Sequence, residues 1–211
     1  MKHSLIISSL LLTSVSWSKD INYMDLVIRN GLHYEKFTDE PFTGKVVGFE
    51  KGYIKAGKIE GEWREYWRNG QLFQEGFFIN GLLEGESITY WENGVLMHKH
   101  NYEKGKENGE FLSYHQNGKL WIRHYFKDGK LEGEALWYHQ NGQLESKDNF
   151  KDNKKEGEWI HYRSNGKLWR KYYYKEGKKN GKWTWYDTYG NLIRTESVSY
   201  THLTLPTIYS V

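Results

Sequence analysis

A period of 24 residues runs through most of this chain. It is marked by glycine at Gly61, Gly85, Gly109, Gly133, Gly157 and Gly181, and again nine residues later at Gly70, Gly94, Gly118, Gly142, Gly166 and Gly190. The second set follows asparagine in five copies and Tyr189 in the last. Two independent marks that keep one period over six copies identify a repeat array. The units of such an array cannot bury a core alone, and they usually present long binding surfaces rather than catalytic clefts.

Each copy has fixed apolar positions when its residues are numbered from the first glycine as zero. Position 5 is always tyrosine and position 11 always leucine, at Tyr66, Tyr90, Tyr114, Tyr138, Tyr162, Tyr186 and at Leu72, Leu96, Leu120, Leu144, Leu168, Leu192. Position 17 is aromatic at Phe78, Tyr102, Phe126, Phe150 and Tyr174. Helical periodicity is absent, and short aromatic-rich runs alternate with turn signals. The sequence therefore predicts an all-β fold, an elongated single-layer antiparallel β-meander of 24-residue hairpin repeats.

Each repeat has two turn signals, such as Asn117-Gly118 and Asp128-Gly129. A type I turn closed by a glycine with positive φ makes a three-residue loop, whereas a two-residue type I′ turn would shift the register by one. With three-residue loops, positions 3, 5, 11 and 17 share one face. All nine tryptophans beyond residue 18 then fall at even positions on the other face: Trp63, Trp67, Trp91, Trp121, Trp137, Trp159, Trp169, Trp183 and Trp185. We therefore expect three-residue loops and a distinct tryptophan face.

The tryptophan face is the candidate partner-binding surface, because tryptophan supplies a large contact area and is enriched at binding hot spots. The alternative is that these rings shield a thin sheet or pack in cross-strand ladders. The regular positions, by contrast, are expected to build the scaffold.

The two ends of the chain lie outside the repeat pattern. Residues 1–18 combine a basic start, an apolar run and small residues at Ser16 and Ser18, which predicts a signal peptide and an exported protein, whether periplasmic, cell-surface or secreted. Residues 19–43 are expected to cap an array over 44–194, which holds one short copy and six 24-residue copies, the last incomplete. Residues 195–211 break the pattern, and from about residue 198 they resemble a translated sequencing adapter.

Composition narrows the function classes. The net charge is +3 and basic residues alternate with acidic ones, which argues against a nucleic-acid partner. The chain has no cysteine, so it has neither disulfides nor thiolate metal ligands. His115 and His139 share position 6 in successive copies, on strands about 9.5 Å apart, which is far for one metal ion. No motif indicates an enzyme, a metal site or a cofactor.

The repeat itself carries a family resemblance. Gly-Glu-Trp-x-x-Tyr-x-x-Asn-Gly-x-Leu, followed by Tyr/Phe-x-x-Gly-Lys, resembles the bacterial variant of the MORN repeat from Pro41 to Arg194. Phe42-Thr43-Gly44-Lys45 is similar to the opening of the YwqK family of MORN-type proteins, often labelled antitoxins of toxin–antitoxin systems. The resemblance implies a single-layer antiparallel sheet used for protein or membrane-surface contacts, and it brings no catalytic residues.

We therefore expect an exported, non-enzymatic, MORN-like scaffold that mediates protein–protein interaction, with an antitoxin-like role as one form of it. Two alternatives stay open for the aromatic face. One is a glycan or a choline-type ligand, which aromatic platforms and cages can bind. The other is an anionic membrane surface, whose attraction would fall as ionic strength rises. The sequence leaves the oligomeric state open.

Overall fold

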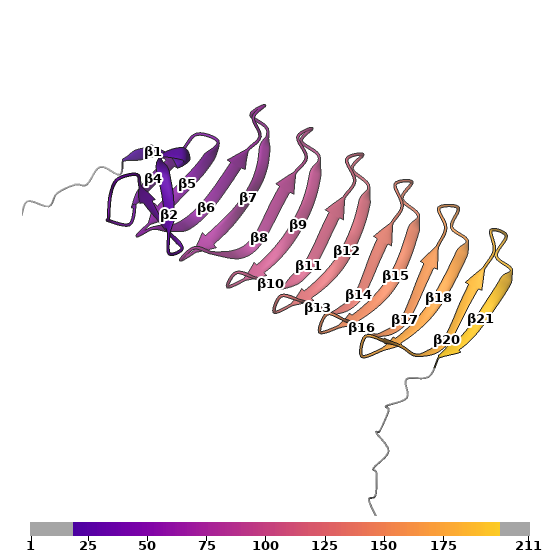
Figure 1. Ribbon diagram of the computed structural model, residues 1–211. Coiled ribbons are helices and arrows are strands. Elements are labelled where there is room, and N and C mark those ends of the chain that lie inside the picture. The colour runs from indigo at the N-terminus through magenta and orange to yellow at the C-terminus, as the bar shows by residue number, and fades with distance from the viewer. Residues whose placement is uncertain (1–18, 199–211) are drawn as a thin grey trace, which may run out of the picture.

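A computed structural model of the protein describes residues 19–198 as an elongated, curved ribbon (Figure 1). A single 19-stranded sheet runs along it, and the predicted single-layer meander of hairpin repeats is confirmed. The predicted signal peptide, residues 1–18, and the chain from residue 199 onward lie outside the described residues. Between residues 19 and 198, no helix is long and apolar enough to cross a membrane.

Each of the six copies forms a hairpin of two strands. The hairpins are β6 (Lys58–Tyr66) with β7 (Leu72–Ile79), β8 (Leu82–Tyr90) with β9 (Leu96–Glu103), β11 (Gly109–Tyr114) with β12 (Leu120–Lys127), β14 (Gly133–Tyr138) with β15 (Leu144–Lys151), β17 (Gly157–Tyr162) with β18 (Leu168–Lys175), and β20 (Gly181–Tyr186) with β21 (Leu192–Val198). Short strands lead into the later copies: β10 (Lys106–Glu107), β13 (Lys130–Leu131), β16 (Lys154–Lys155) and β19 (Lys178–Lys179).

The Asn-Gly signals form the predicted three-residue loops. In the first copy, Gly70 N–H donates to the Trp67 carbonyl at 2.9 Å, and Trp67 N–H donates to the Gln71 carbonyl at 2.8 Å. Gly70 has φ +84°, which glycine adopts without steric cost. Asn69 Oδ1 accepts from Gln71 N–H, and its amide donates to the Glu92 carbonyl in the next loop. The asparagine therefore both closes its own loop and joins it to the next one.

The second turn differs from the prediction, because it is a two-residue loop. Lys127 pairs directly with Lys130, and Asp128 and Gly129 between them have φ 51° and 77°. Positive φ at both central residues defines a type I′ turn, whose twist matches that of the flanking strands. The prediction of three-residue loops is therefore correct for the Asn-Gly turn within each hairpin and wrong for the second turn.

A β-bulge inside each hairpin corrects the predicted faces. Tyr66 pairs with Leu72 as expected, but the preceding residue, Glu65, pairs with Gln74, so Phe73 at position 12 is an extra residue. An extra residue changes which side chains face each other across the rest of the hairpin. Position 17 therefore lies on the tryptophan face. Phe150, for example, lies 5.2 Å from Trp159 between ring centroids, so the prediction that position 17 shares a face with positions 3 and 5 is wrong.

The sheet thus has two faces of different composition. We call the one formed by positions 2, 4, 6, 12, 13, 15 and 17 the aromatic face, and the one formed by positions 1, 3, 5, 14 and 16 the polar face. The nine tryptophans, at positions 2, 4, 6 and 12, all belong to the aromatic face.

The glycine at position 0 lies in a second bulge, where one copy meets the next. Gly76 pairs with Ser87 while Phe78 pairs with Leu83, so two residues of β8 have no counterpart on β7. All six of these glycines have positive φ. At Gly133 no atom lies within 4 Å of where a Cβ would stand, so the backbone conformation, not space, requires glycine.

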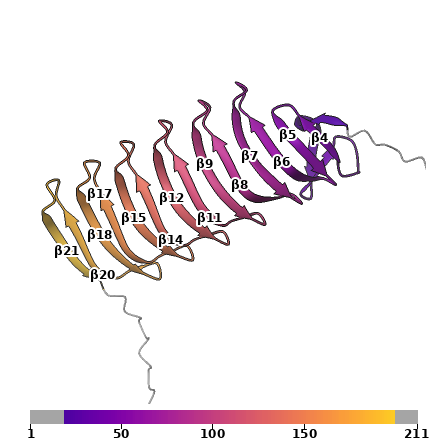
Figure 2. The ribbon, with the colours of Figure 1, turned by 180° about the vertical axis from the view of Figure 1, so that it is seen from behind.

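The N-terminal residues pack at one end of the ribbon, as the view from behind shows (Figure 2). They form β1 (Asp20–Asn22), a 3-10 helix η1 (Tyr23–Asp25), a separate pair of strands β2 (Leu26–Arg29) and β3 (Leu32–Glu35), then β4 (Gly44–Val47) and β5 (Glu50–Lys55). Strand β1 pairs in parallel with β4. A hydrophobic core joins this end to the first hairpin through Ile21, Leu26, Phe42, Val46, Ile54 and Trp63.

Candidate functional site

The polar face carries a regular ladder of opposite charges. In the second to fifth copies, a glutamate at position 1 contacts a basic residue at position 14 of the same copy, as in Glu110 with Arg123 at 2.7 Å and Glu158 with Lys171 at 3.2 Å. The pair recurs in Glu86 with Lys99 and Glu134 with Lys147. Such partly exposed pairs each contribute little to stability. Their regularity and balanced charge give this face a structural character.

The aromatic face is irregular, and its nine tryptophans differ widely in exposure. Trp63, Trp159 and Trp183, at position 2, are only 4%, 7% and 5% exposed. Trp121 and Trp169, at position 12, are 39% and 37% exposed. The other four are half-buried: Trp67, Trp91, Trp137 and Trp185. The position 12 rings therefore offer a partner far more surface than the position 2 rings.

The buried rings pack in a cross-strand ladder. Trp159 lies 5.2 Å from Phe150 on one side and 5.2 Å from Tyr174 on the other, and Tyr174 lies 5.4 Å from Trp183. The ammonium group of Lys155 lies 4.3 Å from the centroid of the Trp159 ring. Ring pairs at these distances stabilise a sheet beyond their buried area. These contacts give Trp159 and Trp183 a structural role.

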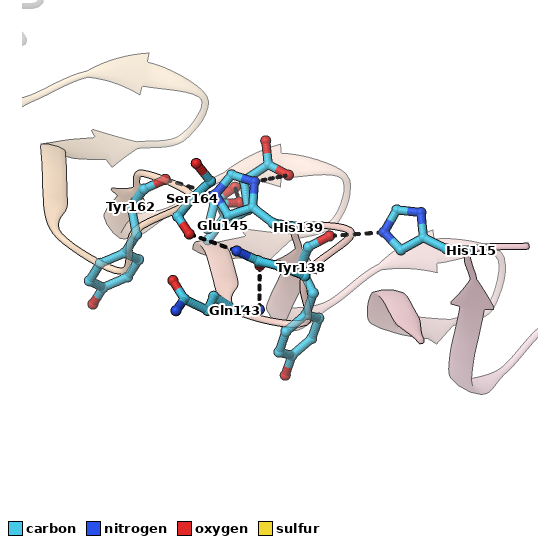
Figure 3. A network of polar contacts seen from close by, with 10 residues as sticks. His115, Tyr138, His139, Gln143, Glu145, Tyr162 and Ser164 are labelled. Atoms are coloured by element: carbon cyan, nitrogen blue, oxygen red, sulfur yellow. Dashed lines mark hydrogen bonds and ion pairs between the residues drawn. The ribbon is translucent and has the colours of Figure 1, made fainter. Parts of the chain in front are cut away.

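Position 6 joins each copy to the next by a hydrogen bond that sequence reasoning missed. Trp67 and Trp91 donate from Nε1 to the carbonyls of Tyr90 and Tyr114, at 3.1 and 3.2 Å. His115 and His139 make the equivalent bond to the carbonyls of Tyr138 and Tyr162 (Figure 3). Arg163 makes it to the carbonyl of Tyr186. The only signal in the sequence is that all five side chains carry an N–H donor.

This ladder also fixes the tautomer of two histidines. A carbonyl oxygen only accepts hydrogen bonds, so Nε2 of His115 and of His139 must carry the proton. In His139, Nδ1 lies 3.7 Å from a carboxylate oxygen of Glu145, and the two form an ion pair only when Nδ1 is protonated as well. Each of these two histidines therefore joins its own copy to the next one: His115 joins the third to the fourth, and His139 joins the fourth to the fifth. Across residues 19–198, no group of three or more His, Cys, Asp or Glu side chains is placed to hold a metal ion.

Two hollows open on the aromatic face near the three-residue loops. The first, of about 390 Å³, lies beside Trp91 and Trp121, where the His115 ring stacks on Trp121 with centroids 5.4 Å apart. The second, of about 480 Å³, lies between Trp137 and His161 over Ser146 and Asp148. In the second hollow, Ser146 Oγ donates to Asp148 at 3.2 Å and not to a histidine. The serine is thus hydrogen-bonded to a carboxylate and not to an imidazole, so the hollow contains no Ser–His pair of the kind used in nucleophilic catalysis.

A row of histidines crosses the same face. His98 and His100 have ring centroids 6.0 Å apart, and both pack on Phe111. His124 lies 4.6 Å from the centroid of Trp137. Burial lowers the pKa of His98, and the neighbouring His100 lowers it further. Burial also lowers the pKa of His124, against an opposing effect of Asp148.

These pKa shifts predict a stability that falls in mild acid. A histidine whose pKa is lower in the folded state than its unfolded value of about 6.5 binds fewer protons when folded. Such a histidine makes its full contribution to the free energy of unfolding above pH 6.5. This contribution is lost as the pH falls toward and through the pKa of the folded state. We expect the free energy of unfolding, measured with urea, to be lower at pH 5 than at pH 7.5. The double variant His98→Gln, His124→Gln should reduce this difference, and an unchanged difference would contradict the assignment.

Comparison with known protein families agrees with the repeat structure. The pattern of the MORN repeat variant matches five segments, residues 59–80, 83–104, 107–130, 131–152 and 155–176, which together span more than half of the chain. No curated protein matches the sequence. Each matched segment covers most of one hairpin, with its three-residue loop, and ends within or just after the two-residue turn that follows. The chain therefore belongs to the MORN repeat variant family.

Proposed function

We propose that this chain is an exported, non-enzymatic scaffold that binds another protein through the first three copies of its aromatic face. The observation that supports this best is Trp121, which is 39% exposed and borders a hollow of about 390 Å³. A large ring beside a hollow is the usual form of a binding hot spot, because it can be fully desolvated by a partner. MORN repeats commonly mediate protein or membrane interactions.

The surroundings of Trp121 extend this surface along the ribbon. We define the loop-edge aromatic row as Trp67, Phe73, Trp91, His115 and Trp121. Trp67 and Phe73 have ring centroids 4.5 Å apart, and the row covers three copies, or about 24 Å across the strands. The corresponding positions of later copies include three charged residues, Glu145, Arg163 and Asp187, beside His139, Trp169 and Ile193. An uncharged aromatic row is typical of the core of a protein interface, where charged residues are depleted.

The proposal predicts that Trp121→Ala weakens binding of the protein partner by about 30-fold or more, since truncating a hot-spot residue costs about 2 kcal/mol or more. The partner is first cross-linked to the full chain and identified, and its Kd is then measured by isothermal titration calorimetry with purified proteins. Trp169→Ala is the matched control, because Trp169 occupies the same position two copies later with nearly the same exposure, 37%.

Equal Kd values for the parent chain and the Trp121→Ala variant would remove the loop-edge aromatic row as the site. Binding to anionic lipid vesicles in place of a protein, released by added salt, would assign the face to a membrane surface. A protein partner is favoured over an anionic membrane, because such a membrane attracts a basic cluster and the loop-edge aromatic row contains no Lys or Arg.

Export and an antitoxin-like role are the finer parts of this proposal. Export rests on the basic start and apolar run of residues 1–18, and it predicts a mature chain that begins at Lys19 in an extracytoplasmic fraction. N-terminal sequencing would show this, and a chain retained with Met1 would contradict it. The antitoxin-like role rests on the resemblance of Phe42-Thr43-Gly44-Lys45 to YwqK-type proteins, and it makes the partner a toxin whose effect co-expression relieves.

A further inference from the structure

The second hollow on the aromatic face exists because one side chain is small. Position 13 holds Gln74, His98, Ile122, Arg170 and Arg194 in the other copies, but Ser146 in the fourth. Ser146 pairs across the sheet with Trp137 on one side and with His161 on the other. These two larger residues therefore stand two strand spacings apart, about 9.6 Å, with only a serine between them. The space of about 480 Å³ over Ser146 is within the range of small-molecule sites.

Unpaired polar atoms converge on this hollow. Asp148, which lines it, is 3% exposed, and its Oδ2 accepts from Ser146 while its Oδ1 has no hydrogen bond. Nε2 of His161 lies 3.3 Å from that oxygen but is not in hydrogen-bond geometry with it. Nε of Arg163 and Nε of Arg170, both on the same hollow, are buried and unpaired as well. Buried polar groups without partners are costly, so such a cluster indicates a site for a polar ligand.

The charges of the hollow narrow the class of ligand. The two arginines are offset by two carboxylates, Glu145 and Asp148. Asp148 would repel an anion, and Arg163 and Arg170 would repel a cation. A hydroxyl group both donates and accepts, so it can satisfy a carboxylate and a guanidinium at once. Trp137, half-buried, adds a carbon-rich wall against which the C–H face of a sugar ring can pack.

We propose that the hollow over Ser146 binds a neutral saccharide of one or two rings. Asp148 accepts hydrogen bonds from the sugar hydroxyls, Arg163 and Arg170 donate to them, and Trp137 covers one face of the ring. The site lies in the fourth and fifth copies, whereas the loop-edge aromatic row lies in the first three. Saccharide binding and protein binding are therefore separate properties of the two halves of this face.

The test uses the full chain and a panel of free sugars: glucose, galactose, mannose, N-acetylglucosamine, cellobiose, lactose and chitobiose. Saturation-transfer difference NMR detects binding, and isothermal titration calorimetry gives Kd. Ser146→Gln introduces the residue that the first copy carries at this position, Gln74, and should weaken binding by about tenfold or more by filling the hollow. Asp148→Asn preserves the shape and should also weaken binding, by about tenfold, through loss of a charged acceptor.

Trp121→Ala is the control. It removes a tryptophan ring from the first hollow and leaves Trp137, in the second hollow, in place, so sugar binding should be unchanged. Far-UV circular dichroism and the thermal midpoint show whether each variant is folded; if Ser146→Gln is not, the near-isosteric Asp148→Asn decides. Failure of every neutral sugar to bind, or equal binding by the parent chain and the folded variants, would overturn the proposal. Inorganic phosphate or choline, added as ionic probes, would overturn the saccharide class if either bound in place of the sugars. Immobilised oligosaccharides then distinguish a free sugar from the terminal residue of a larger glycan.

Discussion

Replacing Trp63 with alanine is expected to lower the free energy of unfolding by about 3–5 kcal/mol, the usual cost of removing a buried aromatic ring. Trp63 is 4% exposed and belongs to the core that joins the N-terminal residues to the first hairpin. Its ring meets that of Tyr23 edge-on, with centroids 5.8 Å apart. The variant therefore removes a side-chain contact that, together with the pairing of β5 with β6, attaches the N-terminal end to the array.

On the side of β5, the surroundings of Trp63 cannot close over the cavity that alanine would leave. Strand β5 passes directly against the ring: a Cβ on Gly52 would lie 2.4 Å from Trp63 Cε3. The wall on that side is thus backbone held in the sheet, with no side chain that could move into the space. The cost of a large-to-small substitution rises with the volume left unfilled.

Urea unfolding followed by far-UV circular dichroism would measure this loss, with Trp121→Ala as the matched control. Trp121 is 39% exposed, so the same substitution there should cost about 1 kcal/mol or less. Similar losses of unfolding free energy in the two variants would mean that Trp63, in the N-terminal core, contributes no more to stability than an exposed ring.

The repeat and its Asn-Gly loops could be predicted because short-range signals determine them, whereas the second turn was predicted as a three-residue loop and has two residues. Asn69-Gly70 specifies a three-residue loop, and that loop sets the pairing of Tyr66 with Leu72. The bulge at position 12 has no such signal. That position holds Phe73, Met97, Trp121, Glu145, Trp169 and Ile193, which share neither size nor polarity. The face of position 17 was therefore mispredicted, since each residue beyond a bulge changes sides.

The candidate sites could not be predicted in full, because they depend on contacts between residues that are distant in the sequence. Trp63 and Trp159 occupy the same position in their copies, but Trp63 is buried by residues as distant as Ile21. The hollow over Ser146 depends on two neighbours that two different bulges place there: Trp137 through the bulge at position 12, and His161 through the bulge between copies at Gly157. The sequence therefore places the tryptophans on one face but does not separate the buried rings from the exposed ones.

Replacing Trp159 with alanine is expected to cost about 3–5 kcal/mol and also to divide unfolding into two transitions. Trp159 links the fourth copy to the fifth: its ring lies 5.2 Å from that of Phe150, and its Nε1 donates to the Asn149 carbonyl at 3.1 Å. In a repeat array, stability is close to a sum of the stability of each copy and the contacts between neighbours. Weakening the contact between the fourth and fifth copies uncouples the copies before it from those after it. Trp63→Ala, by contrast, weakens a contact at the N-terminal end of the array.

Two probes would detect the uncoupling. Hydrogen exchange followed by mass spectrometry reports on each copy separately, and far-UV circular dichroism reports on the whole sheet. In the parent chain the copies on either side of residue 157 should lose protection at the same urea concentration, and in Trp159→Ala at different ones. Trp169→Ala, an exposed ring in the same copy, is the control that should keep one transition. A single shared transition in Trp159→Ala would mean that the hydrogen bonds of the sheet and the side-chain bonds from position 6 couple the copies without the aromatic ladder. Coincident loss of protection would thus assign cooperativity to the backbone and the position 6 donors, and separate loss would assign it to the rings.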